Sequence, residues 1–289
     1  MKELLQKKLS DSAAARWTAL LAVSFTMMCG YFFTDVMSPL EPMLTSNDVN
    51  GLGWTSDEYG FFSGAYGYFN VFLLLLFFGG IILDKFGIRF TGLASTLLMF
   101  GGALIKWWAV SNTFDGSVTL PFGIGTYHTQ VLWASLGFAI YGAGCEIAGI
   151  TVTKIIAKWF TGHELALALP FAKACGGVHA AVGLGAALLC ISVVAFLVYC
   201  VMDKKEDASA EAVQTEPEEG FKFSDLKMLI SNRGFWYMAT LCLMFYAGVF
   251  PFLKFATKLM VFKYGVDENM AGLIPAMLPF GTIFLTPLF

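Results

Sequence analysis

Long apolar segments alternate with short polar ones along most of the chain. A transmembrane helix needs about 20 apolar residues to cross about 30 Å of hydrocarbon. By this criterion the pattern predicts an all-α, polytopic membrane protein, with spans at residues 17–44, 59–83, 90–110, 130–157 and 235–256 and another from 271 onward.

Residues 165–202 fit this pattern poorly. Lysines flank the segment on both sides and place its two ends on the same face of the membrane. Two minimal spans of about 17 residues would barely fit between them. Residues 178–202 predict a helix, but the part before them is short and contains Pro170 and Lys173. Either that first helix is deformed into a partial or re-entrant segment, or part of it is deleted; we favour deletion.

The composition agrees with a protein that is embedded in a lipid bilayer. Of 289 residues, 57% are hydrophobic and 13% are charged, whereas a soluble domain carries about 25% charged residues. Lys and Arg precede the first predicted span and follow the second and fourth, but residues 45–58 and 111–129 contain none. The positive-inside rule therefore predicts a cytoplasmic N-terminus, at the plasma (inner) membrane if the protein is bacterial. Nothing in the chain indicates a nucleic-acid partner.

One acidic, polar stretch interrupts the apolar pattern and suggests two halves. We expect an N-terminal transmembrane bundle at 1–202, a mobile cytoplasmic linker with a short amphipathic helix at 203–232, and the start of a C-terminal bundle at 233–289. Aromatic residues precede a proline in the first helix of each half, at Pro39 and Pro251, as in parallel repeats. Doubling the first half predicts about 400 residues and twelve helices, so we expect this chain to be cut within helix eight.

The segment GGIILDKFGIR at residues 79–89 resembles a motif of the major facilitator superfamily. Its pattern, Gly-x-x-x-Asp-Arg/Lys-x-Gly-x-Arg/Lys, follows the second helix of those proteins. The matching positions are Gly80, Asp84, Lys85, Gly87 and Arg89. The resemblance implies the helical bundle of that superfamily, with charge contacts at these positions that hold one conformation. It also implies a secondary active or facilitative transporter that works by alternating access and is not an enzyme.

Other phrases resemble one branch of that superfamily, which includes a lysosomal dipeptide uniporter and its bacterial relatives. They are YGAGCEIAGITVTKIIAKWF, FYAGVFPFLKFATK and YFFTD. This second resemblance implies a passive or proton-linked carrier for a small zwitterionic solute such as a dipeptide. It also implies that the acid on helix four, Glu146, lies in the substrate site.

Physical reasoning selects Glu146 independently. It lies 12 residues before Lys158, about 18 Å along a helix and therefore near the bilayer centre. Gly142 and Gly149 lie one turn before and after it, so its helix face packs against protein or lines a cavity. Carboxylates at that depth usually belong to a substrate or proton path; the alternative is a structural hydrogen bond.

Asp35 is the second candidate for the substrate site. Tyr31 lies one turn before it, and Pro39 should deprive the Asp35 carbonyl of its helical hydrogen bond. The alternative is that Asp35 is simply hydrated at the mouth of the bundle. By the same argument Pro251 weakens its helix beside Tyr246 and is a candidate gate.

The remaining polar residues carry weaker predictions. Lys106 precedes two tryptophans and is interpreted as a snorkelling interfacial anchor, while Lys254 and Lys258 either attract a carboxylate or snorkel. The six cysteines lie in apolar segments without metal-type spacing, and the three histidines form no ligand pattern. We therefore expect no metal and no cofactor. The alternative to a transporter is a non-transporting scaffold or sensor of the same fold, or an inactive truncated carrier.

Overall fold

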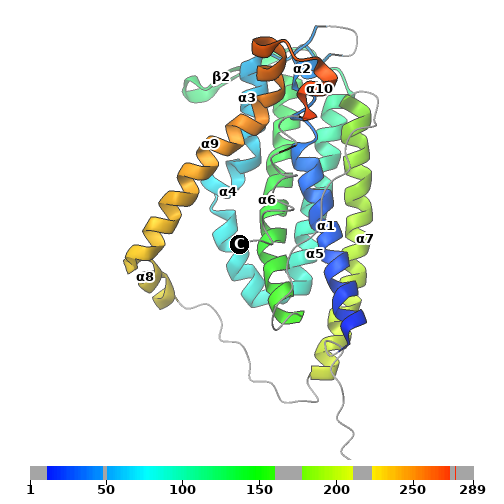
Figure 1. Cartoon of the computed structure of the whole chain (residues 1–289), viewed down its shortest axis with the longest axis vertical. Coiled ribbons are helices and arrows are strands. Elements are labelled where there is room, and N and C mark those ends of the chain that lie inside the picture. Colours follow the sequence, from blue (N-terminus) through cyan, green and yellow to red (C-terminus); the bar gives the residue numbers. More distant parts are fainter. Residues whose placement is uncertain (1–11, 48–50, 160–177, 211–222, 274–276, 278–289) are drawn as a thin grey trace, which may run out of the picture.

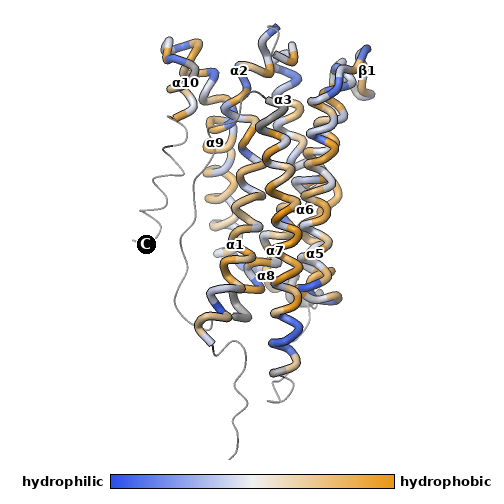
Figure 2. The backbone as a smooth tube through the Cα atoms, turned by 90° about the vertical axis from the view of Figure 1, so that its right-hand side faces the viewer, coloured by the Kyte–Doolittle hydropathy of each residue, from blue (hydrophilic) through white to orange (hydrophobic). Residues whose placement is uncertain are grey.

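The computed structural model describes residues 12–47, 51–159, 178–210, 223–273 and 277. Within these residues, five helices are long and apolar enough to cross a membrane: α1 (Ala13–Asp35), α5 (Leu75–Ser111), α6 (Thr129–Trp159), α7 (Val178–Ala210) and α9 (Arg233–Tyr264). Helices α1, α5, α6 and α7 stand side by side, and α9 leans away from them at an angle (Figure 1). Hydrophobic residues cover the middle of the bundle, as Figure 2 shows.

Shorter elements lie at the two ends of the bundle and before α5. One end carries α2 (Glu41–Leu44), the start of α3 (Ser56–Gly64), α10 (Glu268–Ala271) and an antiparallel hairpin of β1 (Ser117–Leu120) and β2 (Gly125–His128) around η3 (Pro121–Gly123). We call it the outer end, after its predicted orientation. The opposite, inner end carries α8 (Phe223–Ser231) (Figure 1). The hairpin was not foreseen in the sequence.

The second predicted span, 59–83, is a chain of short pieces. Helix α3 is followed by η2 (Ala65–Gly67) and α4 (Tyr68–Phe72), and α5 begins only at Leu75. Leu74 has a positive φ of 49°, a left-handed conformation that ends a helix. The prediction of one continuous helix was therefore wrong.

Glycine contacts set the distances between the long helices. A Cβ on Gly137 would lie 2.6 Å from the backbone nitrogen of Lys106, and one on Gly144 would lie 2.7 Å from that of Met99. Helices α5 and α6 therefore touch backbone to backbone, which small residues allow in membrane bundles. Gly185 of α7 likewise admits the ring of Phe33 from α1, at 2.5 Å from where its Cβ would be.

The core of the described bundle is aromatic toward its outer end. The rings of Phe62 and Phe138 stack with centroids 5.0 Å apart, and Phe138 also stacks on Tyr141 at 5.9 Å. Phe33 meets Tyr141 at 4.9 Å. Since these rings come from α1, α3 and α6, they join the first helix to the broken second one and to the fourth span.

The helix boundaries correct several sequence predictions. The first span ends at Asp35 and not at residue 44. The predicted boundary between the second and third spans is confirmed, because α5 consists of two helices that meet at a kink at Gly87. Helix α7 continues to Ala210, so residues 203–210 are helical and not part of a mobile linker. Of the cysteines in the described residues, Cys29 and Cys145 are buried, but Cys190 and Cys242 are exposed. The segment 160–177, where we favoured a deletion, and most of the chain after 271 lie outside the described residues.

A buried carboxylate fastens α3 to the hairpin. Thr55 and Glu58 form a capping box at the start of α3. The same carboxylate accepts a hydrogen bond from the backbone of His128 at 2.8 Å, and the imidazole Nδ1 lies at 2.7 Å. Burial alone would raise the pKa of Glu58, but the backbone hydrogen bonds from His128 and Thr55 outweigh it and lower that pKa. The sequence did not indicate this partner of His128.

This arrangement predicts a specific dependence of stability on pH. Because the pKa of Glu58 is lowered by folding, its contribution is complete above the ordinary glutamate value of about 4.3. It is lost as the pH falls through the lowered pKa of the folded protein. Thermal unfolding should therefore show Glu58→Gln less stable than the unmodified chain at neutral pH, with the difference shrinking in acid. The control is Asp57→Asn at an exposed neighbour; a constant difference at all pH values would contradict the assignment.

Candidate functional site

The carboxylate of Glu146 on α6 lies against η2, where the segment of α3 and α4 is broken. Tyr66, which belongs to η2, donates a hydrogen bond from its hydroxyl to Glu146 Oε1 at 2.7 Å. Asn70 lies one turn further along that segment and donates to the carbonyl of Gly142 at 3.2 Å. Any Cβ on Gly142 would overlap the backbone of Tyr66. The glycine predicted to give Glu146 a close neighbour therefore does so, and that neighbour supplies the phenol.

Tyr31 connects the other predicted substrate residues to Glu146. Its phenol, on α1, lies within electrostatic range of Glu146, Asp35 and Tyr246. Tyr31 and Tyr246 are both about half-exposed, and Tyr246 stacks on Phe250 of its own helix at 5.1 Å. Tyr31 of α1 thus lies within range of both Glu146 and the Tyr246 phenol of α9.

Asp35 does not present a free carbonyl as we had expected. Ser38 turns its backbone N–H back to the Asp35 carbonyl at 3.0 Å, because the chain leaves the helix in a tight turn before Pro39. The carboxylate instead forms an ion pair with Lys254 of α9 at 2.8 Å, and Lys254 also donates to the Thr34 carbonyl at 3.1 Å. The structure therefore places Asp35 in a contact between the two predicted halves.

A second ion pair closes the same end of the molecule. Lys258, one turn beyond Lys254, lies 3.2 Å from the fully buried Glu41 of α2 and donates to the Ser56 hydroxyl at 2.7 Å. Burial raises the pKa of Glu41 above its ordinary value, although Lys258 acts in the opposite direction. For Lys254 and Lys258 the sequence left open either snorkelling or attraction of a carboxylate, and the structure shows that each pairs with a carboxylate. We call Asp35, Glu41, Lys254 and Lys258 the outer gate.

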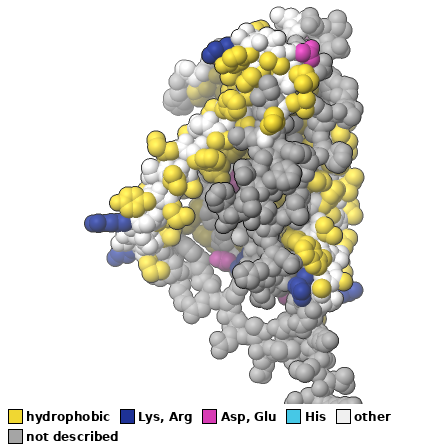
Figure 3. Space-filling view, in the orientation of Figure 1, with side chains coloured by type: hydrophobic (Ala, Val, Ile, Leu, Met, Phe, Trp, Pro, Cys, Tyr) yellow, Lys and Arg dark blue, Asp and Glu magenta, His cyan; other side chains and the backbone are white. Residues whose placement is uncertain are grey.

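Tyr59 adds an aromatic contact to the outer gate. Its hydroxyl donates to the backbone carbonyl of Lys254 at 3.1 Å, and its ring meets that of Phe255 edge-on at 5.4 Å. Among the residues of α9 the structure describes, only Ala256 and Thr257 are buried. Apolar side chains lie exposed along α9 (Figure 3). This helix diverges from the bundle in the direction of the inner end of the molecule (Figure 1). The two halves thus meet at the outer end.

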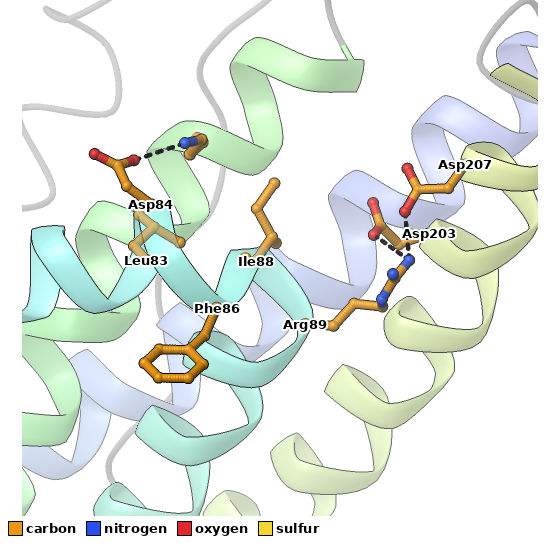
Figure 4. A pocket seen from close by; sticks show the side chains of 9 residues that line it. Leu83, Asp84, Phe86, Ile88, Arg89, Asp203 and Asp207 are labelled. Carbon is orange, nitrogen blue, oxygen red and sulfur yellow. Dashed lines mark hydrogen bonds and ion pairs between the residues drawn. The ribbon is translucent and has the colours of Figure 1, made fainter. Parts of the chain in front are cut away.

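The charged motif lies at the inner end and is held by ion pairs within the first half. Asp84 accepts from Lys154 of α6 at 2.8 Å, the kind of basic partner that its position predicted. Arg89 reaches across to α7 and pairs with Asp203 at 3.2 Å and with Asp207 at 2.5 Å. These side chains line a pocket of about 370 Å³, and Figure 4 shows the two pairs on either side of it.

The glycines of the motif act differently from our expectation. Gly87 has a φ of 78° and interrupts α5, as only glycine does without strain. Among the described residues, a Cβ on Gly80 or Gly87 would meet nothing within 4 Å, whereas one on Gly79 would lie 2.9 Å from Ile147. The close approach of a neighbouring helix is therefore at Gly79. Lys85 points over the ring of Phe86 at 5.6 Å.

Sequence reasoning missed three residues of this region. Tyr66 and Asn70 were overlooked because an unbroken helix gave no reason to choose them, although Gly64 and Gly67 flanking Tyr66 were a usable signal. Glu41 was overlooked because it was assigned to the end of a span. Within the described residues, no group of His, Cys, Asp and Glu could hold a metal ion.

Comparison with known proteins identifies the family of this chain. Residues 20–289 match the Major Facilitator Superfamily. The lysosomal dipeptide transporter MFSD1 of Bos taurus is 23% identical over 96% of this chain and 60% of its own length. The Homo sapiens protein of that name is 21% identical over the same shares, and the Danio rerio protein is 24% identical over 70% of this chain and 46% of its own length. No solved structure matches.

The chain thus spans 60% or less of the length of these relatives. The match to the superfamily covers nearly all of the described helices, including the charged motif, the helix that carries Glu146 and the outer gate. This chain is an integral, multi-pass membrane protein and belongs to the Major Facilitator Superfamily.

Proposed function

We propose that this protein moves a small zwitterionic solute, of the size of a dipeptide, across a membrane by alternating access. The observation that carries the proposal is the environment of Glu146. Its carboxylate is oriented by Tyr66, and no described side chain forms an ion pair with it. A carboxylate deep in a membrane protein without a counter-ion is costly. A substrate ammonium, or a proton, is the partner that this site lacks.

The distribution of charge supports a zwitterion in particular. Tyr31 lies within electrostatic range of both Glu146 and Asp35, and Asp35 is paired with Lys254. A solute with its ammonium at Glu146 would find the ammonium of Lys254 on the side toward the outer gate. The names of the similar proteins, which describe dipeptide transporters, are compatible with such a solute.

The arrangement of the halves supports alternating access. At the outer end, Lys254 and Lys258 pair with two acids of the first half, while α9 separates from the bundle toward its inner end (Figure 1). We interpret this as a state closed at the outer end and accessible from the inner end. With the N-terminus cytoplasmic, as the positive-inside rule predicts, that state faces the cytoplasm; in a bacterium the membrane would be the plasma membrane.

Other predicted gating residues keep their proposed roles. Asp84, Gly87 and Arg89 line the inner pocket, and Gly80 and Lys85 belong to the same charged motif. The ion pairs of Asp84 and Arg89 would keep the first half rigid as α9 moves. Pro251 lies within α9, between the exposed inner part of that helix and the residues of the outer gate. Bending there would let one part move while the other remains docked.

Glu146→Gln tests the substrate site, because the shape is kept and the charge is lost. We expect binding of a labelled dipeptide to weaken at least tenfold and its dependence on pH to disappear, since a charge-assisted hydrogen bond is replaced by a neutral one. The measurement is equilibrium binding and uptake by proteoliposomes between pH 5 and 8.

Two further variants control this experiment. Tyr66→Phe should weaken binding less, by a few-fold, because the carboxylate stays but loses its orienting hydrogen bond. Asp57→Asn, at an exposed acid near the outer surface, should have no effect. Unchanged affinity, uptake and pH profile in Glu146→Gln would make Glu146 a structural residue and refute the proposed site.

Lys254→Met tests the outer gate. Removing the ion pair and the contact to the Thr34 carbonyl should raise the population of molecules that are open at the outer end. Spin labels at two exposed positions, Asp57 on α3 and Lys263 on α9, would report that distance in a background without native cysteines. The matched control is Lys227→Met on α8, which is also exposed. Equal distance distributions in the two variants would show that Lys254 does not hold the gate.

A further inference from the structure

Lys106 is buried completely within the bundle. It lies on α5 with none of its surface exposed, whereas its neighbours Trp107 and Trp108 are both exposed. Our interpretation of Lys106 as a snorkelling anchor was therefore wrong. The helix turns the two tryptophans outward and the lysine inward, so the interfacial pattern in the sequence describes only the tryptophans.

Three aromatic rings and one carbonyl surround the Lys106 ammonium. Its Nζ lies 4.2 Å from the centroid of Phe33, 4.4 Å from that of Phe138 and 5.4 Å from that of Phe62. It donates a long hydrogen bond of 3.5 Å to the Phe33 carbonyl. Among the described residues, none forms an ion pair with it. Ring faces attract a cation, but they replace a carboxylate only in part.

The carboxylate that follows Phe33 on α1 belongs to Asp35, and it already pairs with Lys254. The last turn of α1 presents the carbonyls of Phe33 and Thr34, followed by the Asp35 carboxylate. Lys106 donates to the Phe33 carbonyl. Lys254 donates to the Thr34 carbonyl and also pairs with the Asp35 carboxylate. Asp35 and Lys254 are both within electrostatic range of Lys106. Two ammonium groups thus share the negative end of one helix, and only one of them has a carboxylate.

The Asp35 side chain can change partner because it is not packed in place. Its side chain is 61% exposed, and it follows the helix turn against which Lys106 lies. Lys254, by contrast, belongs to α9, whose described hydrogen bonds and ion pairs with the first half lie at the outer end. When the outer gate opens, Lys254 must leave with α9, and Asp35 loses its partner while Lys106 stays.

We propose that Lys106 is the alternate counter-ion of Asp35. In the closed outer gate Asp35 pairs with Lys254, and Lys106 remains among the rings of Phe33, Phe62 and Phe138. In the open gate Asp35 turns to Lys106. This exchange lowers the cost of opening, because neither state leaves the carboxylate alone. Lys106 is thus a positioning residue for the transport cycle. The inference rests on the proposed outer gate.

The test is a mutant cycle. In each variant, the distance between spin labels at positions 57 and 263 reports the ratio of molecules that are open and closed at the outer end. Lys258→Met loosens the outer gate but leaves the pair of Asp35 with Lys254 in place, and so supplies a background in which the outer-open state is populated. In it, Lys106→Met should reduce the ratio of open to closed molecules at least fivefold, within the usual range of coupling between sites. When Asp35→Asn is added to that background, Lys106→Met should leave the ratio unchanged, because the partner is missing. Lys106→Arg should retain the open state.

The outcomes separate this inference from the gate on which it rests. If Lys106→Met changes the ratio equally with and without Asp35, or in neither case, Lys106 has only a packing role and the exchange is refuted while the gate stands. If neither Lys254→Met nor Lys258→Met alone changes the outer distance, both the gate and the exchange are refuted. Should Lys106→Met not fold, Lys106→Gln replaces it under the same criteria, because its amide can still donate to the Phe33 carbonyl.

Discussion

The backbone contact between α5 and α6 is the constraint on which the rest of the bundle depends. Gly137 and Gly144 let α6 approach within reach of the α5 backbone. At that separation Lys106 comes under the ring of Phe138 at the outer end. A larger side chain at either glycine would push the helices apart and loosen this contact, because close-packed interiors transmit strain. Before the interruption of α5 at Gly87, Gly79 lies against Ile147 of α6, and Lys154 of α6 reaches Asp84 at the inner end.

Three charged groups of the bundle illustrate three ways to bury a charge. Lys106 is surrounded by aromatic rings, Glu146 accepts a phenol hydrogen bond, and Lys254 has a carboxylate. Only the last is an ion pair. In a low-dielectric environment an incompletely compensated charge favours any change that brings an opposite charge to it. For Glu146 the change that we propose is the arrival of a solute or proton, and for Lys106 it is the release of Asp35 from the outer gate.

The two halves differ in how firmly they are held. The first half is a continuous bundle with glycine contacts, an aromatic core and ion pairs at its inner end. In contrast, α9 is attached through a small outer region around Tyr59 and the two lysines, Lys254 and Lys258. A few polar contacts can be exchanged at modest free-energy cost, whereas the packed core cannot be rearranged at a similar cost. The interface is therefore suited to opening and closing while the first half moves as a unit.

The sequence by itself determined the membrane class, most of the long helices, the charged motif and the choice of Glu146 and Asp35. These follow from local properties: the length of apolar runs, the spacing of charges, and the cost of an acid in hydrocarbon. The tertiary structure decided the partners. The break at η2 that brings Tyr66 to Glu146, the burial of Lys106 and the pairing of Glu41 with Lys258 all join residues far apart in the chain. Hydropathy records how apolar a segment is, but not which of its faces meets another helix, and so these contacts were decided by packing alone.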